Sequence, residues 1–293
     1  MSQASQRRRA ILLVLSAALL FSGVGACIKA LEGGVPLAMV VLFRSFFSLP
    51  VMIPILLAHG GLRALATQQP GWHALRTAFG LVGMAGAFHG YATLPLATVT
   101  ALGFTMPLFL TLLSIPLLGE RVGIRRFAAV VVGFLGVLVI LRPGLDGPGT
   151  WFDYGFVLLA ALGWALAMIT IRRMGQGGEP GAAIVLWFAI GASSVAACFA
   201  IPVWVWPTAM QWALLVGAGL TAGIAQLFMT EAYRRGDTTV IAPFEYSAII
   251  WTGILGYLLW AETPDLFDGL GIAILVACGL YIWHREVTLG LKR

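Results

Sequence analysis

Long apolar runs separated by short polar turns make up almost the whole chain. Each run is close to the length of about 20 residues that a helix needs to cross a bilayer, and glycine and proline mark many of the turns. The regular alternation of apolar and polar residues that is typical of a membrane β-barrel is absent. The pattern therefore predicts an all-α membrane protein with ten transmembrane helices. The predicted segments are residues 10–31, 36–58, 74–93, 97–118, 126–142, 154–172, 181–203, 209–232, 239–260 and 267–283.

The composition excludes two other classes of protein. Apolar residues make up 60% of the 293 residues and charged residues only 10%, against about 45–50% and about 25% in soluble domains. A soluble domain of this size has too little interior to bury so much apolar surface. An intrinsically disordered chain would contain far fewer large apolar residues. The mean hydropathy of +0.94 agrees with lipid as the solvent.

Most of the positive charge falls on one side of the predicted bundle. With a cytoplasmic N-terminus, only Lys29 and Arg142 of the 18 lysines and arginines lie on the outer side, and Arg44 lies within a span. The other 15 lie on the inner side: Arg7, Arg8, Arg9, Arg63, Arg76, Arg121, Arg125, Arg126, Arg172, Arg173, Arg234, Arg235, Arg285, Lys292 and Arg293. Because positively charged loops favour the cytoplasm, we expect both termini to be cytoplasmic. The net charge of +6 is thus spread over the inner loops, and we expect no nucleic-acid partner.

The first half of the chain recurs in the second half. A shift of 142 residues superimposes similar side chains, and a shift of 143 does so elsewhere, with the change falling in loops where insertions are expected. The matched pairs include Tyr91 and Tyr233, Phe104 and Tyr246, Thr105 and Ser247, Glu120 and Glu262, and Lys29 and Arg172. Five spans per half is an odd number, so the second half enters the membrane from the opposite side. The chain is therefore predicted to form two inverted five-helix repeats, a common build in secondary transporters, although duplicated folds have other uses.

Each half also carries the same short motifs. They are Gly90-Tyr91, Pro107 and Leu118-Gly119-Glu120 in the first half, and Ala232-Tyr233, Pro243 and Trp260-Ala261-Glu262 in the second. This arrangement resembles the paired EamA domains of the drug/metabolite transporter superfamily over nearly the whole chain, although Thr263-Pro264-Asp265 follows the second glutamate where Arg121-Val122 follows the first. The resemblance implies a ten-helix fold in a bacterial-type inner membrane, with a central substrate cavity reached from each side in turn. The predicted division is a cytoplasmic tail (1–9), a first EamA-like repeat (10–142), a periplasmic linker (143–153), a second EamA-like repeat (154–283) and a cytoplasmic tail (284–293).

Two charged residues lie deep within the predicted spans. At 1.5 Å per residue, Arg44 is about 12 Å below the outer face and Glu245 is about 9 Å from the inner face. Charges in the hydrocarbon are costly and are functional candidates by default, so both are candidates for binding a substrate or a coupling proton. A modest helix tilt and the length of an arginine would bring the two together. A structural ion pair that fixes helix packing is therefore the alternative.

His89 and Glu231 occupy equivalent positions in the two repeats. Inversion places His89 toward the outer mouth of the bundle and Glu231 toward the inner mouth. Histidine titrates near physiological pH, so a proton-linked role is one hypothesis. The alternatives are a hydrogen-bonded packing histidine and an interfacial carboxylate beside Arg234 and Arg235.

The fourth and ninth segments carry the densest polar series, and each contains an interior proline, Pro107 or Pro243. Proline frees backbone carbonyls that need a partner, and interruptions at corresponding places in both halves point to a transporter's binding site. The further candidate site residues on and around these segments are Tyr91, Thr105, Trp164 and Tyr246. The alternative is that the hydroxyl groups bond to their own helices and that the aromatic rings pack in the core or against lipid.

No enzymatic motif accompanies these residues. The chain has no phosphate-cradling loop, no His/Cys metal spacing and no nucleophile elbow, and its three cysteines lie singly in apolar runs. We therefore expect no enzyme activity, no catalytic residue, no cofactor and no metal. The absence of a nucleotide-binding domain leaves a gradient as the driving force.

The predicted function is secondary active transport of a small organic metabolite by alternating access. The resemblance favours export of an amino acid or related metabolite, and uptake of a vitamin, nucleoside or S-adenosylmethionine-like metabolite is the alternative. A membrane-embedded interaction protein or a lipid-modifying enzyme is the alternative from another class. The expected partners are the small-molecule substrate, the lipid bilayer and a coupling proton, with the chain as a monomer or a homodimer.

Overall fold

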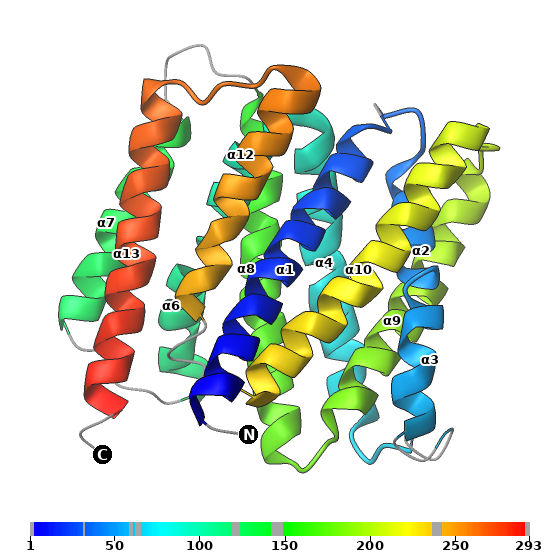
Figure 1. Ribbon diagram of the computed structural model, residues 1–293, viewed down its shortest axis with the longest axis horizontal. Coiled ribbons are helices and arrows are strands. Elements are labelled where there is room, and N and C mark those ends of the chain that lie inside the picture. The colour runs from blue at the N-terminus through cyan, green and yellow to red at the C-terminus, as the bar shows by residue number, and fades with distance from the viewer. Residues whose placement is uncertain are drawn as a thin grey trace.

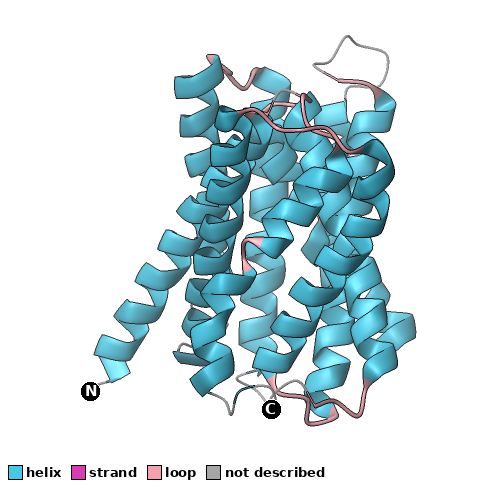
Figure 2. Cartoon of the chain, turned by 90° about the vertical axis from the view of Figure 1, so that its right-hand side faces the viewer, coloured by secondary structure: helices cyan, strands magenta, loops and turns pink. Residues whose placement is uncertain are grey.

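The computed structural model describes residues 3–31, 33–58, 61, 66–118, 124–141, 149–235 and 242–290, and within these ranges all regular structure is helical. The helices run alongside one another between two ends that carry the connecting loops (Figures 1 and 2). The elements are α1 (Gln3–Lys29), α2 (Leu37–Phe46), α3 (Leu49–Ala58), α4 (Pro70–Thr93), α5 (Leu96–Gly103), α6 (Met106–Leu118), α7 (Ile124–Leu141), α8 (Trp151–Gln176), α9 (Gly181–Ala200), the 3₁₀ helix η2 (Ile201–Val203), α10 (Ala209–Arg235), the 3₁₀ helix η3 (Ala242–Tyr246), α12 (Ser247–Trp260) and α13 (Leu266–Gly290).

Helical elements fall on every segment that the apolar pattern predicts. The second and fourth segments contain turn residues between two helices, and the ninth changes from the 3₁₀ helix η3 to α12 without a gap; we call these three positions interruptions. A proline stands at the second position of a helix beside each one: Pro50 in α3, Pro107 in α6 and Pro243 in η3. Proline is tolerated there because the first N–H groups of a helix have no partner within it. Pro107 and Pro243 led us to expect the breaks in the fourth and ninth segments, whereas the break in the second segment was not predicted.

Long-range packing joins helices from the first and second halves of the chain. Helix α1 packs along α10 and α12, α8 packs along α4 and α6, α2 packs on α9, and α7 packs on α13. In Figure 1, α7 and α13 form one side of the bundle, α2, α3, α9 and α10 form the other, and α1, α4, α8 and α12 lie between them. Two apolar clusters fill the interior, one around Met39, Phe43 and Met84 and the other around Leu102, Ile140 and Leu275.

Helices α4 and α8 approach closely because glycines line their contact. A Cβ atom at Gly86 would collide with the carbonyl oxygen of Phe156, and one at Gly163 would lie 2.9 Å from the carbonyl oxygen of Phe79. Small residues let the backbones of membrane helices come together, and van der Waals packing then supplies the attraction. The contact matters for function because both helices carry candidate site residues.

Seven helical stretches in the described residues are long and apolar enough to cross a membrane, and a shorter apolar helix covers residues 127–141. The seven are residues 8–29, 37–54, 96–113, 151–176, 183–203, 209–229 and 266–284. Large apolar side chains lie exposed on the outside of the bundle, among them Leu57, Ile124, Phe199 and Trp206, as expected of a surface that faces lipid. The chain is therefore a multi-pass membrane protein, and the predicted count of ten spans stays a prediction.

Candidate functional site

Two arginine side chains reach the middle of α4. Arg44 of α2 places its Nη1 atom 3.9 Å from the Sδ atom of Met84. Arg76 of α4 lies with its guanidinium 3.9 Å from the centre of the Phe188 ring of α9. Gly80 makes room for this arrangement, because a Cβ atom there would collide with both Arg76 and Phe188. The charge of Arg44 acts on Arg76, and both side chains are partly buried, so α2, α4 and α9 together hold a partly buried cationic group.

Neither arginine has an acidic partner within the described residues. The buried Nε atom of Arg44 and the buried Nε and Nη1 atoms of Arg76 have no hydrogen-bond partner there. The ion pairs found in the same ranges join other residues: Lys29 with Glu262, His73 with Glu179, and His89 with Asp153. Buried charges are ordinarily paired or hydrogen-bonded, so the two arginines are candidates for binding a group from outside the protein.

Trp164 of α8 connects the two arginines to a second cluster. Its Cδ1 and Nε1 atoms occupy the space that a Cβ atom at Gly83 of α4 would need, and its Cζ3 atom lies 3.6 Å from the Cβ position of Gly103 at the end of α5. Trp164 also packs against the apolar cluster that contains Met84. The indole therefore lies between the cationic group and the interruption that follows α5.

The interruptions of the fourth and ninth segments meet through stacked aromatic rings. Phe104 follows α5 and Tyr246 ends η3, and their ring centroids are 4.4 Å apart with planes at 26°. The adjacent Thr105 is fully buried and donates its hydroxyl to the carbonyl oxygen of Leu102 at 2.6 Å. Thr105 and Tyr246, two of the predicted site residues, thus lie where the two helix breaks come together.

Arg44 and Glu245 have different surroundings. Arg44 lies among α2, α4 and α9, whereas η3, which carries Glu245, packs against α1, α12 and α13. The charge of Glu245 acts on the neighbouring Tyr246. The ion pair that the sequence suggested as an alternative role is not among the described contacts of Arg44, so Arg44 keeps its place as a binding candidate.

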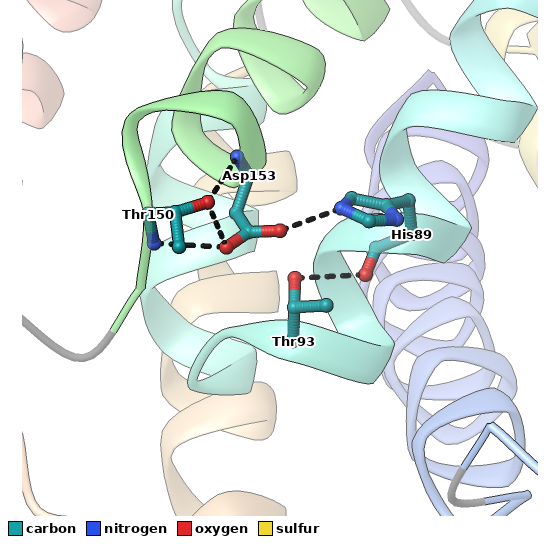
Figure 3. A network of polar contacts seen from close by, with 4 residues as sticks. All are labelled: His89, Thr93, Thr150 and Asp153. Atoms are coloured by element: carbon teal, nitrogen blue, oxygen red, sulfur yellow. Dashed lines mark hydrogen bonds and ion pairs between the residues drawn. The ribbon is translucent and has the colours of Figure 1, made fainter.

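His89, near the end of α4, binds the start of α8 (Figure 3). Its Nε2 atom lies 2.6 Å from Oδ1 of Asp153. The hydroxyl and the backbone N–H of Thr150 donate to Oδ2 of Asp153 at 2.6 and 2.8 Å, and the backbone N–H of Asp153 donates back to the Thr150 hydroxyl at 3.3 Å. This reciprocal capping box fixes the start of α8. Asp153 therefore caps one helix and binds the histidine of another, while Thr93 donates its hydroxyl to the His89 carbonyl oxygen at 3.0 Å.

The remaining two predicted site residues are Tyr91 and Glu231. The Tyr91 ring packs against α1, with its Cζ atom 3.2 Å from the Cβ position of Gly25, and it contributes to both apolar clusters. Glu231 falls within α10, but its side chain lies outside the described residues. The placement of His89 and Glu231 at opposite mouths therefore stays a prediction.

An ion pair ties connecting segments together at the end of the bundle where α1 and α12 finish. The Nζ atom of Lys29 lies 2.8 Å from Oε1 of Glu262 and donates to the carbonyl oxygen of Leu94 at 2.8 Å. The backbone N–H of Leu96 donates to Oε2 of Glu262 at 3.0 Å. Ala261 ends α12 in the left-handed conformation, with φ of 55°, and Glu262 follows it directly. We call Lys29, Leu94, Leu96 and Glu262 the end contact.

A small pocket lies beside the end contact. It is lined by Pro95, Ala97, Thr98, Thr252, Gly253, Gly256, Glu262 and Pro264. These residues come from the start of α5, from α12 and from the segment that follows α12. The end contact therefore covers a space between the fourth and ninth predicted segments. This space lies between the stacked rings of Phe104 and Tyr246 and the end of the bundle that carries the end contact.

The sequence does not single out Arg76 and Asp153, and both omissions arise at helix starts. Helix α4 begins at Pro70 rather than at residue 74, which places Arg76 in the second turn of the helix rather than in the first. Proline favours the first position of a helix, so Pro70 is the signal that could have found this start. At α8 the signal is Thr150 followed three residues later by the acidic Asp153, because this spacing is that of a capping box.

Most of the chain is similar in sequence to proteins that are named as transporters. The S-adenosylmethionine uptake transporter of Rickettsia prowazekii (strain Madrid E) is 30% identical over 247 residues, which cover 84% of this chain and 83% of that protein. The riboflavin transporter of Rhizobium johnstonii is 33% identical over 251 residues, covering 84% and 79%. The pseudopaline exporter CntI of Pseudomonas aeruginosa (strain UCBPP-PA14) is 30% identical over 275 residues, covering 92% and 94%.

A solved crystal structure shares the fold. It superimposes with a TM-score of 0.67 and covers 98% of this chain and 100% of its own, at 23% sequence identity. The sequence profile of the EamA-like transporter family matches this chain twice, at residues 8–142 and at residues 151–283. Together these matches confirm the resemblance that the repeated motifs suggested: the chain belongs to the EamA-like transporter family of the drug/metabolite transporter superfamily.

Proposed function

We propose that this chain is a secondary active transporter that moves a small organic metabolite across a bacterial-type inner membrane. Ten transmembrane helices form two inverted five-helix repeats, residues 10–142 and 154–283, joined by a periplasmic linker and with both termini in the cytoplasm. The repeats expose a shared central site to each side of the membrane in turn. The chain is a carrier rather than an enzyme, in keeping with relatives that are named for transport.

The observation that carries this proposal is the pairing of helices between the halves. Helices α1 and α8 are the first spans of the two repeats, and α4 and α10 are the third spans. Helix α1 packs along α10 and α8 packs along α4, so the first span of each repeat lies on the third span of the other. The pairs α2 with α9 and α7 with α13 join equivalent spans. An inverted two-fold relation between the halves produces this pattern, and alternating access is built on such a relation.

The central site of the proposal lies where the equivalent interruptions meet. Phe104 and Tyr246 are matched positions in the two repeats, and their rings stack on one another. Residues that lie on a two-fold axis contact their own equivalents, so this stack supports an axis through the two breaks. Trp164 then links this position to Arg44 through α4.

The end contact supports the gating part of the proposal. Alternating access needs contacts that close one end of the carrier at a time, and Lys29 with Glu262 ties α1 to the segment after α12. With a cytoplasmic N-terminus this is the outer end. The repeat matches Lys29 with Arg172 and Glu262 with Glu120, so we expect an equivalent contact at the inner end. Both of these side chains lie outside the described residues.

The proposal also includes a substrate class and a direction of transport. The relatives include an uptake transporter and an exporter, so family membership is compatible with both directions. We propose export of an amino acid or related metabolite. Uptake of a vitamin, nucleoside or S-adenosylmethionine-like metabolite is the alternative, because relatives that match most of the chain are named a riboflavin transporter and an S-adenosylmethionine uptake transporter.

Counterflow in proteoliposomes tests the transport mechanism. Vesicles that contain the purified full chain are loaded with unlabelled riboflavin, S-adenosylmethionine or a mixture of amino acids, and the labelled compound is added outside. A carrier exchanges the two pools, so one compound should enter transiently above its equilibrium level, and the rate should saturate. Empty liposomes are the control. Flux that rises linearly with concentration and ignores the internal pool would indicate a channel, and folded protein without any flux would refute the function.

Coupling to protons is proposed at His89, because its Nε2 atom lies 2.6 Å from Oδ1 of Asp153 and an imidazole and a carboxylate in contact can pass a proton between them. A pH gradient across the same vesicles should drive accumulation by the wild type and not by His89→Gln. The matched control is His73→Gln, since His73 forms the other described histidine–carboxylate pair, with Glu179. Accumulation by His89→Gln at the wild-type level would exclude His89 from coupling.

A further inference from the structure

The space between α2, α4 and α9 holds two partly buried arginines whose positive charges the described residues do not neutralise. A guanidinium group keeps its charge under all ordinary conditions and carries five N–H donors. Three buried donor nitrogens of this pair, Nε of Arg44 and Nε and Nη1 of Arg76, lack a hydrogen-bond partner. The electrostatic neighbour of Arg76 is Arg44, a like charge, so their proximity opposes folding rather than supporting it. Proteins keep arrangements that lower their stability mainly at functional sites, so the arginine pair is a candidate for function.

The two side chains converge on one short stretch of α4. The Nη1 atom of Arg76 lies beside Gly80, one turn beyond its own Cα atom, and the Nη1 atom of Arg44 lies beside Met84, one turn further along. At 1.5 Å per residue these two positions on α4 are about 6 Å apart along the helix axis. The Phe188 ring lies over the guanidinium of Arg76, and stacking on the face of a guanidinium leaves its in-plane donors able to bind a ligand.

We infer that Arg44 and Arg76 bind an anionic group of the transported molecule, a carboxylate or a phosphate. This inference rests on the proposed transport function and adds the chemical class of the substrate to it. A planar guanidinium presents paired N–H donors that match two oxygens of a carboxylate or phosphate. One anion held by both arginines supplies the missing hydrogen bonds and cancels the repulsion between them. In the empty carrier the two arginines therefore repel one another, and a bound anionic substrate removes this repulsion.

Anion binding is measured on the full chain in an uncharged detergent, by thermal unfolding in sodium succinate or sodium phosphate against sodium chloride of equal ionic strength. A ligand that binds only the folded state raises its melting temperature in a saturable way. We expect succinate or phosphate to do so with the wild type, and Arg44→Gln and Arg76→Gln to weaken the apparent affinity at least tenfold. The matched control is Arg173→Gln, because the exposed Arg173 donates to the Leu117 carbonyl oxygen at 2.6 Å, away from this group. It should respond as the wild type does.

Melting without added anion separates binding from a structural role. Because the two arginines repel one another, Arg44→Gln and Arg76→Gln should melt at or above the wild-type temperature in chloride alone. An arginine that serves the packing would instead lower the melting temperature when it is replaced, and would leave the response to succinate and phosphate intact. That combination of results overturns the inference.

Two further outcomes also overturn it. The first is a wild-type protein that neither succinate nor phosphate stabilises at 100 mM, on the order of the weakest affinity that this assay detects. The second is stabilisation by phosphatidylglycerol in mixed micelles that needs Arg44 but is not reproduced by either soluble anion, since that result assigns the arginines to a lipid headgroup. Counterflow keeps the two proposals distinct. Flux without anion binding refutes only this inference, whereas anion binding without flux of any compound refutes only the transport function.

Discussion

Breaking the end contact is expected to open the outer end of the central site. Glu262→Gln is the sharpest perturbation, because the amide keeps an oxygen that can accept from the backbone N–H of Leu96 but loses the charge that binds Lys29. If the outward-closed state alone contains this ion pair, its loss shifts the balance toward states that are open to the outside. The variant therefore tests whether Lys29 and Glu262 form a gate or only support the fold.

The geometry of the end contact sets the size of the effect. The Nζ–Oε1 distance is 2.8 Å, and the Lys29 and Glu262 side chains are 13% and 17% exposed, so the pair is largely but not fully removed from water. Hydrogen bonds between charged groups contribute about 1.5–3 kcal/mol, and partial exposure favours the lower part of that range, about 2 kcal/mol. Since 1.4 kcal/mol corresponds to a factor of ten, the ratio of closed to open carrier should fall about 30-fold.

Cysteine accessibility measures this ratio. Thr98 lines the pocket beside the end contact and is 1% exposed, so a cysteine at this position should react slowly with a membrane-impermeant maleimide added outside. The experiment uses Thr98→Cys in a chain whose three native cysteines are replaced. Adding Glu262→Gln should raise the rate of labelling by an amount that approaches the 30-fold shift. Lys29→Met should act in the same direction, and the double variant should add little to either single one, because all three remove the same ion pair.

The matched control breaks a comparable pair elsewhere. Glu179→Gln removes the 2.9 Å contact between Glu179 and His73, which joins the start of α4 to the segment between α8 and α9. This variant should not accelerate labelling at Thr98→Cys. A Glu262→Gln protein that folds normally and labels at the unchanged rate would refute the gate, and acceleration by Glu179→Gln as well would show general loosening of the bundle.

The other predictions concern topology, packing and the ninth segment. A single cysteine at Gly61 should be labelled only from the cytoplasm and one at Gly147 only from outside, and the reverse pattern would contradict the ten-span arrangement. Gly86→Ala should destabilise the protein by about 1–3 kcal/mol, because its Cβ atom meets the backbone of α8. Gly155→Ala, whose Cβ atom meets nothing within 4 Å, should change the melting temperature little or raise it. Glu245→Gln should fold but lose flux or its pH dependence, since a carboxylate in an interrupted membrane segment is costly to keep without a role; unchanged flux with an unchanged pH profile would remove Glu245 from the mechanism.

The positions of the helices were predictable because the long apolar runs of a membrane protein are subject to one strong constraint on the backbone. Every backbone polar group in lipid must be satisfied within the chain, so long apolar runs become helices. The breaks after α5 and before α12 were also predictable, since Pro107 and Pro243 cannot donate a backbone hydrogen bond. The break after α2 was harder to foresee, because Pro54 lies inside α3 without ending it, while Pro50 is the second residue of that helix. A proline alone does not say which of these roles it takes.

The neighbours of each candidate were less predictable than the candidates themselves. Arg44 lies in a candidate membrane span. Helix depth suggested Glu245 as its partner, whereas the structure places Met84 beside it and lets its charge act on Arg76. Helix depth predicts where a side chain lies along the membrane normal. Which side chain it contacts depends on which helices are adjacent. The packing of α2 on α4 and α9 arises from contacts between segments far apart in the chain, and no local pattern encodes it.

The cationic group also breaks the symmetry that organises the rest of the chain. A shift of 142 or 143 residues carries Arg44 onto Leu186 or Trp187, and a shift of 142 carries Arg76 onto Ala218, so the second repeat has no charge at either position. The stacked rings of Phe104 and Tyr246, by contrast, join equivalent positions. An inverted repeat gives a carrier two similar end states, which requires the helices to match but leaves the chemistry of the site free to differ. Selectivity for a substrate that is itself asymmetric has to come from residues that depart from the repeat. The residues that set the substrate class are therefore those that comparison of the two halves cannot reveal.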